Sequence, residues 1–218
     1  MAENLHSVRK SYEKDELSKK SIAEKPMDQF SHWFSELKKT NELDEIHELN
    51  AMTLTTMGID GFPKGRVVLL KKFDAEGFYF YTNYGSEKGK AIAENPKVSL
   101  SFFWPNLERQ VIVKGIAEKT SEEDSSEYFH SRPKGSQLGA AVSQQSSVVE
   151  SRDILEEKLK ELEKKYENVE VPKPLEWGGY KITPLFMEFW QGRRNRLHDR
   201  ILYTLEKGGT WKIERLAP

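Results

Sequence analysis

Gly65–Thr82, with the sequence GRVVLLKKFDAEGFYFYT, indicates the fold class more directly than any other part of the chain. Gly65–Phe73 is rich in β-branched and aliphatic residues and predicts a strand, and Phe78–Thr82 predicts a second strand. Ala75-Glu76-Gly77 between them predicts a tight turn. Since no helix fits between two strands joined so closely, we expect an antiparallel sheet.

The same alternation of strand and turn continues on both sides of this stretch. Further predicted strands are Ala51–Thr56, Lys97–Trp104, Arg109–Glu118, Ile201–Leu205 and Trp211–Leu216, the last two joined by a hairpin at Lys207-Gly208-Gly209-Thr210. About six or seven strands with peripheral helices favour a mainly β protein built on a small antiparallel barrel.

Helices are expected around the sheet. Met27, Phe30, Phe34 and Leu37 recur at helical spacing after Pro26 and predict one buried face. The other predicted helices are a short one capped by Ser86, one that begins with a capping box at Ser121 and Asp124 and ends at Pro133, and a partly exposed one at Ser151–Tyr166.

Composition limits the classes of function. Lys and Arg number 34 against 35 Asp and Glu, so we expect no global field suited to nucleic acid or a membrane surface. The absence of cysteine and the irregular spacing of five histidines predict no metal site. No signal peptide or bilayer-spanning run is visible, which predicts a cytoplasmic protein. Residues 1–25 predict a mobile arm and residues 26–218 a single domain.

A cationic stretch, Glu188–Arg200, is the densest concentration of chemical groups in the chain. If Asn195–Leu202 is a strand, alternation places Arg196, His198 and Arg200 on one face. Such a row requires an anion opposite to it, which is either an acidic side chain or a bound phosphate.

Other cations lie beside predicted strands and helix starts. Arg66 and Lys71 fall on opposite faces if their strand is regular. Lys88 lies in the first turn of its helix, where backbone amides attract anions, although a solvated lysine explains it equally well. Three residues spaced by four would form a phosphate cradle with Lys71 if their segment stays helical: Tyr128, Arg132 and Ser136.

Neutral side chains are also available for a planar heterocycle, namely Gln110, Gln145, Ser146 and Trp190. The sequence contains no Ser-His-Asp arrangement, nucleophile elbow, Walker loop or GxGxxG motif after a strand. An enzyme of this kind is expected to take its chemistry from an organic cofactor.

Taken together, these segments resemble the pyridoxine (pyridoxamine) 5′-phosphate oxidase family from Arg9 to Pro218. The most specific motifs are Arg196-Leu197-His198-Asp199-Arg200 and the terminal Arg215-Leu216-Ala217-Pro218. The other motifs are Arg9-Lys10-Ser11-Tyr12, Arg66–Lys71, Tyr81-Thr82-Asn83, Arg109-Gln110-Val111, Tyr128–Ser136, Gln145-Ser146-Ser147, Trp177-Gly178-Gly179-Tyr180 and Glu188–Gly192.

The resemblance implies an FMN-binding split β-barrel of antiparallel Greek-key type, and a homodimer with FMN at the subunit interface. It also implies oxidation of pyridoxine or pyridoxamine 5′-phosphate to pyridoxal 5′-phosphate, the last step of vitamin B6 synthesis or salvage, with O2 reduced to H2O2. The FMN contacts implied are Arg66, Val67, Val68, Leu69, Leu70, Lys71, Tyr81, Thr82, Lys88, Gln110, Gln145, Ser146, Trp190 and Arg200. The substrate contacts implied are Lys71, Tyr128, Arg132, Ser136, Arg196, Leu197 and His198, with Arg196 and His198 catalytic and with Arg9, Lys10, Ser11 and Tyr12 as an arm or product site.

One departure concerns Ser86-Glu87-Lys88, because the family commonly has an Arg-Lys pair after this serine. Glu87 is expected to weaken FMN binding at most, and Arg193 and Arg194 add positive charge elsewhere. Within the proposed reaction, His198 is either a base or an orienting hydrogen-bond partner. Alternative functions are a non-catalytic split-barrel carrier or sensor of flavin or haem, and a single-stranded nucleic-acid binder.

Overall fold

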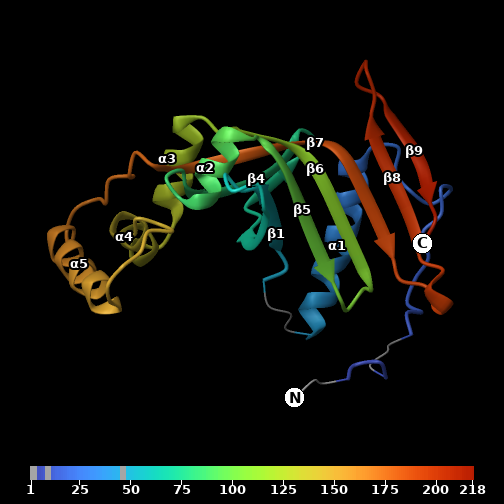
Figure 1. The fold of residues 1–218 in the computed structure, drawn as a ribbon, viewed down its shortest axis with the longest axis horizontal. Helices are drawn as coiled ribbons and strands as arrows, with labels where there is room; N and C mark the ends of the chain where they lie inside the picture. Colours follow the sequence, from blue (N-terminus) through green and yellow to red (C-terminus); the bar gives the residue numbers. More distant parts are fainter. Residues whose placement is uncertain (1–3, 8–10, 45–47) are drawn as a thin grey trace. The chain divides into compact units, whose positions relative to one another are not determined.

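The computed structural model describes residues 4–7, 11–44 and 48–218 (Figure 1). Its helices are α1 (Pro26–Asp44), α2 (Glu87–Glu94), α3 (Glu122–Ser131), α4 (Lys134–Val142) and α5 (Arg152–Lys165), with a 3-10 turn η1 (Arg194–Arg196). Its strands are β1 (Ala51–Met57), β2 (Pro63–Leu69), β3 (Lys72–Asp74), β4 (Gly77–Asn83), β5 (Lys97–Trp104), β6 (Arg109–Lys119), β7 (Trp177–Gln191), β8 (Asp199–Leu205) and β9 (Trp211–Leu216). Within the described ranges, no helix combines the length and apolarity needed to cross a membrane.

The strands pair in the order β2-β1-β5-β6-β7-β4-β3, and β8 pairs with β7 and β9. The β3–β4, β4–β7, β7–β8 and β8–β9 ladders are antiparallel, as the sequence predicts. The expectation of six or seven strands is wrong, because the described chain forms nine. The expected strand Gly65–Phe73 is interrupted at Leu70 and Lys71, so the regular alternation between Arg66 and Lys71 does not hold. The interruption has a topological reason: β2 and β3 belong to opposite ends of the strand order.

The chain forms two compact units, and the first comprises the described residues of 1–53, 99–114 and 184–218. Its core is aromatic: Phe30 lies 5.1 Å from Phe102 and 5.9 Å from Trp104 between ring centroids. The predicted apolar face of α1 is confirmed, because Met27, Phe30, Phe34 and Leu37 are all buried. The predicted β8–β9 hairpin is also confirmed, and Figure 1 shows β8 beside the C-terminal part of β7.

Within this first unit, the N-terminal segment is anchored through Leu17, which is only 4% exposed. The Leu17 backbone donates to Asp199 and accepts from Arg215. Arg109 reinforces the attachment, since its buried guanidinium bonds Asp15, Glu36 and Gln191.

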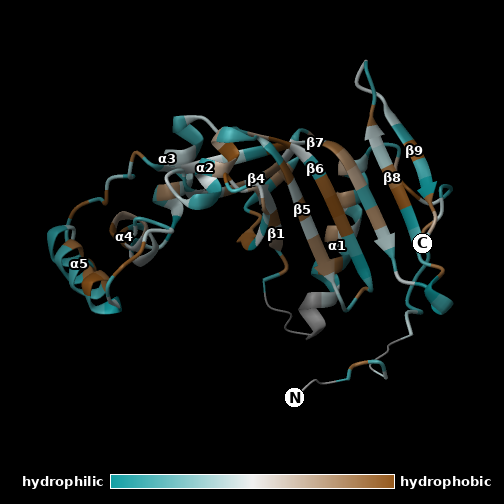
Figure 2. Ribbon diagram, viewed as in Figure 1, coloured by the Kyte–Doolittle hydropathy of each residue, from teal (hydrophilic) through white to brown (hydrophobic). Residues whose placement is uncertain are grey.

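The second unit comprises residues 54–98 and 115–183 and contains α2 to α5. The predicted caps Ser86 and Ser121 are confirmed, since they accept from the backbone amides of Gly89 and Asp124. A buried cluster of Phe129, Leu138, Val171 and Trp177 receives the apolar side of α5. Figure 2 shows the rest of α5 as hydrophilic, which confirms a partly exposed packing helix.

Candidate phosphate-binding site

The second unit contains a cavity of about 680 Å³ that brings together all four residues of the predicted phosphate cradle. We call it the cradle cavity, and its cradle residues are Lys71, Tyr128, Arg132 and Ser136. They come from the β2–β3 connection, α3, the end of α3 and α4. These side chains offer two cations and two hydroxyls, which is a suitable set for a phosphate monoester.

The segment from Tyr128 to Ser136 is not one continuous helix as expected, yet its cradle residues still line the same cavity. The helix α3 ends at Ser131, and Arg132 adopts an extended conformation (φ −77°, ψ 150°) because it precedes Pro133. A new helix, α4, then begins at Lys134, and the Ser136 amide donates to the Pro133 carbonyl. The break therefore redirects the chain without removing Ser136 from the cavity.

Arg132 is held in place but has no acidic partner among the described residues. Its Nη2 donates to the Ser136 carbonyl at 2.8 Å, and its guanidinium lies 4.8 Å from the Trp177 ring centroid. Its buried Nη1 has no hydrogen-bond partner in the part of the chain that the structure describes. Burial lowers the pKa of Arg132. An unsatisfied buried cation of this kind is stabilised by an incoming anion.

Lys88 supplies another cation to the same cavity, and it is only 9% exposed. Its Nζ donates to Gln145 at 2.9 Å, Thr82 at 3.2 Å and the cap Ser86 at 3.3 Å. These partners are neutral, and burial, with the charge of Arg66, lowers the pKa of Lys88 to about 8. The alternative of a solvated lysine is therefore wrong.

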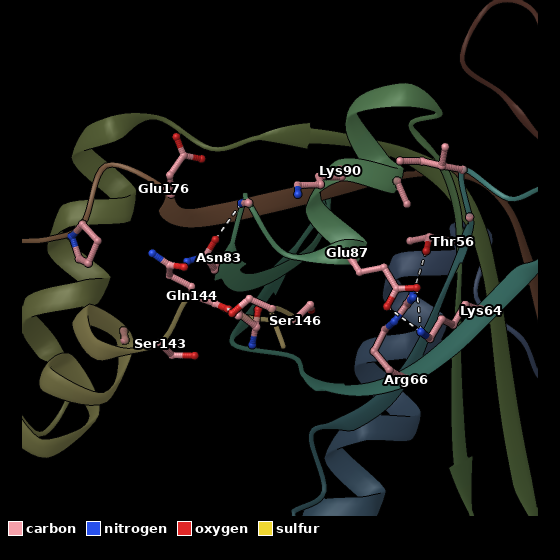
Figure 3. Close-up of a pocket in the computed structure, with 18 of the residues that line it drawn as sticks. Thr56, Lys64, Arg66, Asn83, Glu87, Lys90, Ser143, Gln144, Ser146 and Glu176 are labelled. Atoms are coloured by element: carbon pink, nitrogen blue, oxygen red, sulfur yellow. Dashed lines mark hydrogen bonds and ion pairs between the residues drawn. The ribbon is translucent and has the colours of Figure 1, made fainter. Parts of the chain in front are cut away.

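A second cavity of about 690 Å³, which we call the Arg66 cavity, shares Gln145 with the cradle cavity (Figure 3). Arg66 donates to the Leu54 carbonyl and to Thr56, and burial lowers its pKa. Ser146 also lines this cavity and has a left-handed backbone (φ 73°), which is uncommon for a residue other than glycine.

Figure 3 also shows a cation that the sequence reasoning missed. Lys64 donates to both carboxylate oxygens of Glu87, at 2.6 and 2.7 Å. Lys64 and Arg66 are two residues apart in one strand, so period-two alternation is the signal that would have found Lys64. The Glu87 charge is therefore neutralised from the neighbouring strand.

In the first unit, Trp190 and His198 lie 4.7 Å apart between ring centroids, and Tyr12 contacts both rings edge-on. His198 Nδ1 accepts from the Arg193 amide at 3.1 Å. Burial and the charge of Arg196 lower the pKa of His198, so its neutral form is favoured near pH 7.

The predicted strand Asn195–Leu202 is wrong in its first half. Asn195 and Arg196 have left-handed backbones (φ 57° and 61°) within η1, and β8 begins only at Asp199. Arg196, His198 and Arg200 therefore do not share one strand face. For Arg200, the anion opposite is an acidic side chain, because its Nε donates to Glu188 at 2.7 Å.

The remaining predicted residues have varied positions. Val67, Val68, Leu69, Tyr81 and Thr82 line the cradle cavity. Leu70 is buried, Leu197 is 69% exposed, and Gln110 donates to Ser101. Ser11 bonds Glu13, while Arg9 and Lys10 lie outside the described residues.

The fold is that of a split-barrel protein, and its cradle cavity gathers cationic and hydroxyl side chains. A solved FMN-binding protein from Nostoc punctiforme shares this fold, with a TM-score of 0.66 at 14% identity, covering 85% of this chain and 97% of its own. The PhzG protein from Burkholderia lata 383, solved with tetrahydrophenazine-1-carboxylic acid, gives a TM-score of 0.84 at 27% identity, covering 94% and 98%.

The family is defined by sequence. The family model for "Pyridoxamine 5′-phosphate oxidase" matches residues 39–166. The family model for "Pyridoxine 5′-phosphate oxidase C-terminal dimerisation region" matches residues 177–218. A relative named pyridoxine/pyridoxamine 5′-phosphate oxidase, from Flavobacterium johnsoniae, is 59% identical and covers 98% of this chain and 99% of its own. One of the same name from Christiangramia forsetii is 54% identical over the full length of both chains. The chain therefore belongs to the pyridoxamine 5′-phosphate oxidase family, and the second match supports a homodimer.

Proposed function

We propose that this protein is an FMN-dependent oxidase that converts pyridoxine 5′-phosphate or pyridoxamine 5′-phosphate to pyridoxal 5′-phosphate. The observation that carries the proposal is the convergence of Lys71, Tyr128, Arg132 and Ser136 on one cavity. It is supported by relatives of that name that match nearly the whole chain. Molecular oxygen would be the electron acceptor and hydrogen peroxide the second product.

The residues around Lys88 and Arg66 fit the cofactor. Both cations form their hydrogen bonds with neutral oxygen atoms, so they remain available to a phosphate. Val67, Val68 and Leu69 add an apolar edge along the cradle cavity, which suits a flat ring system. Bound FMN would supply the acceptor for the hydride that leaves the C4′ carbon of the substrate.

The cradle residues would hold the phosphate of the substrate. Lys71 and Arg132 would neutralise its charge, while the Tyr128 and Ser136 hydroxyls would donate to its oxygens. Fixing one end of the substrate positions the other end for reaction, and this positioning is the main contribution we assign to the chain.

Arg196 and His198 are proposed to contact the pyridine ring. The Arg193 amide donates to His198 Nδ1, so the neutral imidazole carries its proton on Nε2. We therefore favour an orienting donor role for His198 over a base role. The left-handed backbone of Arg196 stores strain of about 1–3 kcal/mol, a cost typical of functional positions.

The remaining parts of the proposal follow from family membership. The two FMN molecules would lie at the interface of a homodimer, where Gln110, Trp190 and Arg200 would contribute. The segment Arg9-Lys10-Ser11-Tyr12 would act near the active site, and the protein would work in the cytoplasm.

Purified protein loaded with FMN tests the proposal. We expect a yellow protein that forms pyridoxal 5′-phosphate and an equal amount of hydrogen peroxide from either substrate in air. A yellow protein without turnover would instead support a flavin carrier or sensor. A colourless protein that binds oligonucleotides in a salt-sensitive manner would support the nucleic-acid alternative.

A further inference from the structure

We propose that Trp177 is a positioning residue for the phosphate cradle, acting through Tyr128 and Arg132. This inference rests on the proposed function, because it assigns a role in binding the phosphorylated substrate. Trp177 is the first residue of β7 and is only 6% exposed, yet it lines the cradle cavity.

Trp177 contacts an aromatic pair that belongs to the same cavity. The centroids of Tyr81 and Tyr128 are 4.0 Å apart, and Trp177 lies 5.7 Å from the first and 6.1 Å from the second. The angles between the three ring planes do not exceed 25°. Because the Trp177 ring lies near both tyrosine rings and nearly parallel to them, it supports both rings and thereby the direction of the Tyr128 hydroxyl.

The same indole also supports the guanidinium of Arg132. The 4.8 Å separation from the Trp177 centroid is shorter than the 5.7 Å separation from Phe129, the other ring beneath this cation. Arg132 has no carboxylate contact among the described interactions, so the aromatic ring and the Ser136 carbonyl determine where its unpaired Nη1 lies. Two of the four cradle groups therefore depend on one indole.

The backbone around Trp177 is shaped for this arrangement. Gly179 pairs with Tyr81 in the β4–β7 ladder. A Cβ at Gly179 would lie 2.6 Å from Thr120 Oγ1 and 2.7 Å from Tyr81 Cε1, so a larger residue would crowd both side chains. Lys173 donates to the Trp177 carbonyl at 2.9 Å and fixes the start of the strand. These contacts hold the backbone at the start of β7 and leave room for the Tyr81 ring.

Trp177→Leu tests the role, with Trp177→Phe as the conservative variant. The control is Trp33→Leu, because Trp33 is also buried and also lies beneath an arginine, Arg109, at 4.5 Å, but in the first unit. Each FMN-loaded variant is assayed with pyridoxine 5′-phosphate and with unphosphorylated pyridoxine. Binding of inorganic phosphate to each protein is measured separately by calorimetry.

We expect Trp177→Leu to raise KM for the phosphorylated substrate by about tenfold with kcat nearly unchanged, and to weaken phosphate binding by a similar factor. Turnover of unphosphorylated pyridoxine should stay the same. Trp177→Phe should recover much of the loss, and Trp33→Leu should lower stability without changing KM.

Wild-type KM and phosphate affinity in Trp177→Leu would overturn the inference, as would equal losses on both substrates. If the leucine variant does not fold, Trp177→Phe decides, since an unchanged KM and phosphate affinity there would also overturn it. If the wild-type protein lacks oxidase activity, the proposed function fails, whereas the phosphate-binding measurement still tests the role of Trp177.

Discussion

Replacing Arg132 with methionine should separate substrate binding from folding stability. The substitution removes the charge but keeps an unbranched side chain of similar reach. The protein loses the bond to the Ser136 carbonyl and the contact with Trp177. It also loses an unpaired buried nitrogen, whose burial is unfavourable.

These changes nearly cancel in the free energy of unfolding. The lost hydrogen bond and cation–π contact cost about 1–2.5 kcal/mol together, and relief of the unpaired buried group returns about 1–3 kcal/mol. We therefore expect the free energy of unfolding to stay within about 1 kcal/mol of the wild-type value. A phosphate contact with Arg132 is charge-assisted, so its loss should raise KM about ten- to hundredfold.

The assay compares pyridoxine 5′-phosphate with pyridoxine and measures unfolding by chemical denaturation. The matched control is Arg152→Met, because Arg152 is exposed and forms its ion pair with Glu156, one helical turn away. The control should change neither KM nor stability beyond about 0.5 kcal/mol. The reasoning is refuted if Arg132→Met keeps the wild-type KM, or if its stability falls by about 3 kcal/mol or more.

Further predictions concern other charged groups. The pKa of Lys88 is about 8 in the folded apoprotein, below the 10.5 of the unfolded chain. The stability of the apoprotein should therefore rise from pH 8 to 10.5, while its affinity for FMN falls. Denaturation and flavin titrations check these two trends, and Lys88→Met should abolish both. Glu87→Gln should tighten FMN binding about three- to tenfold and Lys64→Met should weaken it, as measured by flavin fluorescence. If both variants bind FMN with the affinity of the wild-type protein, neither residue belongs to the phosphate site. Arg109→Met should lower the free energy of unfolding by about 2–4 kcal/mol, as measured by chemical denaturation, because it leaves the Oε1 atom of the fully buried Gln191 without its Arg109 donor. His198→Gln, which keeps a donor, should retain most of kcat and His198→Phe should not; equal losses in the two variants would favour a base.

Much of the fold could be predicted because its signals are local. The caps at Ser86 and Ser121, the apolar face of α1 and the hairpin glycines all depend on residues close in sequence. Gly208 and Gly209 both adopt positive φ angles (107° and 85°), which explains their place in the turn. The four cradle residues do line one cavity, but the spacing argument for them is wrong in its premise, because Pro133 interrupts the helix that it assumed.

What could not be predicted depends on contacts between distant residues. The pairing of Arg200 with Glu188 follows from the β7–β8 register, which no local pattern specifies. The left-handed Arg196 breaks an alternation that appears regular in sequence, because nothing in an arginine indicates a positive φ. The lowered pKa of Lys88 likewise depends on burial by residues distant in sequence, such as Gln145.

The most direct test of the account is a crystal structure of the FMN-loaded protein with pyridoxal 5′-phosphate. We predict that its phosphate oxygens lie within about 3 Å of the polar side-chain atoms of Lys71, Tyr128, Arg132 and Ser136, with Arg132 Nη1 newly bonded. A phosphate bound elsewhere, with the cradle cavity filled only by solvent, would contradict the assignment of this cavity to the substrate.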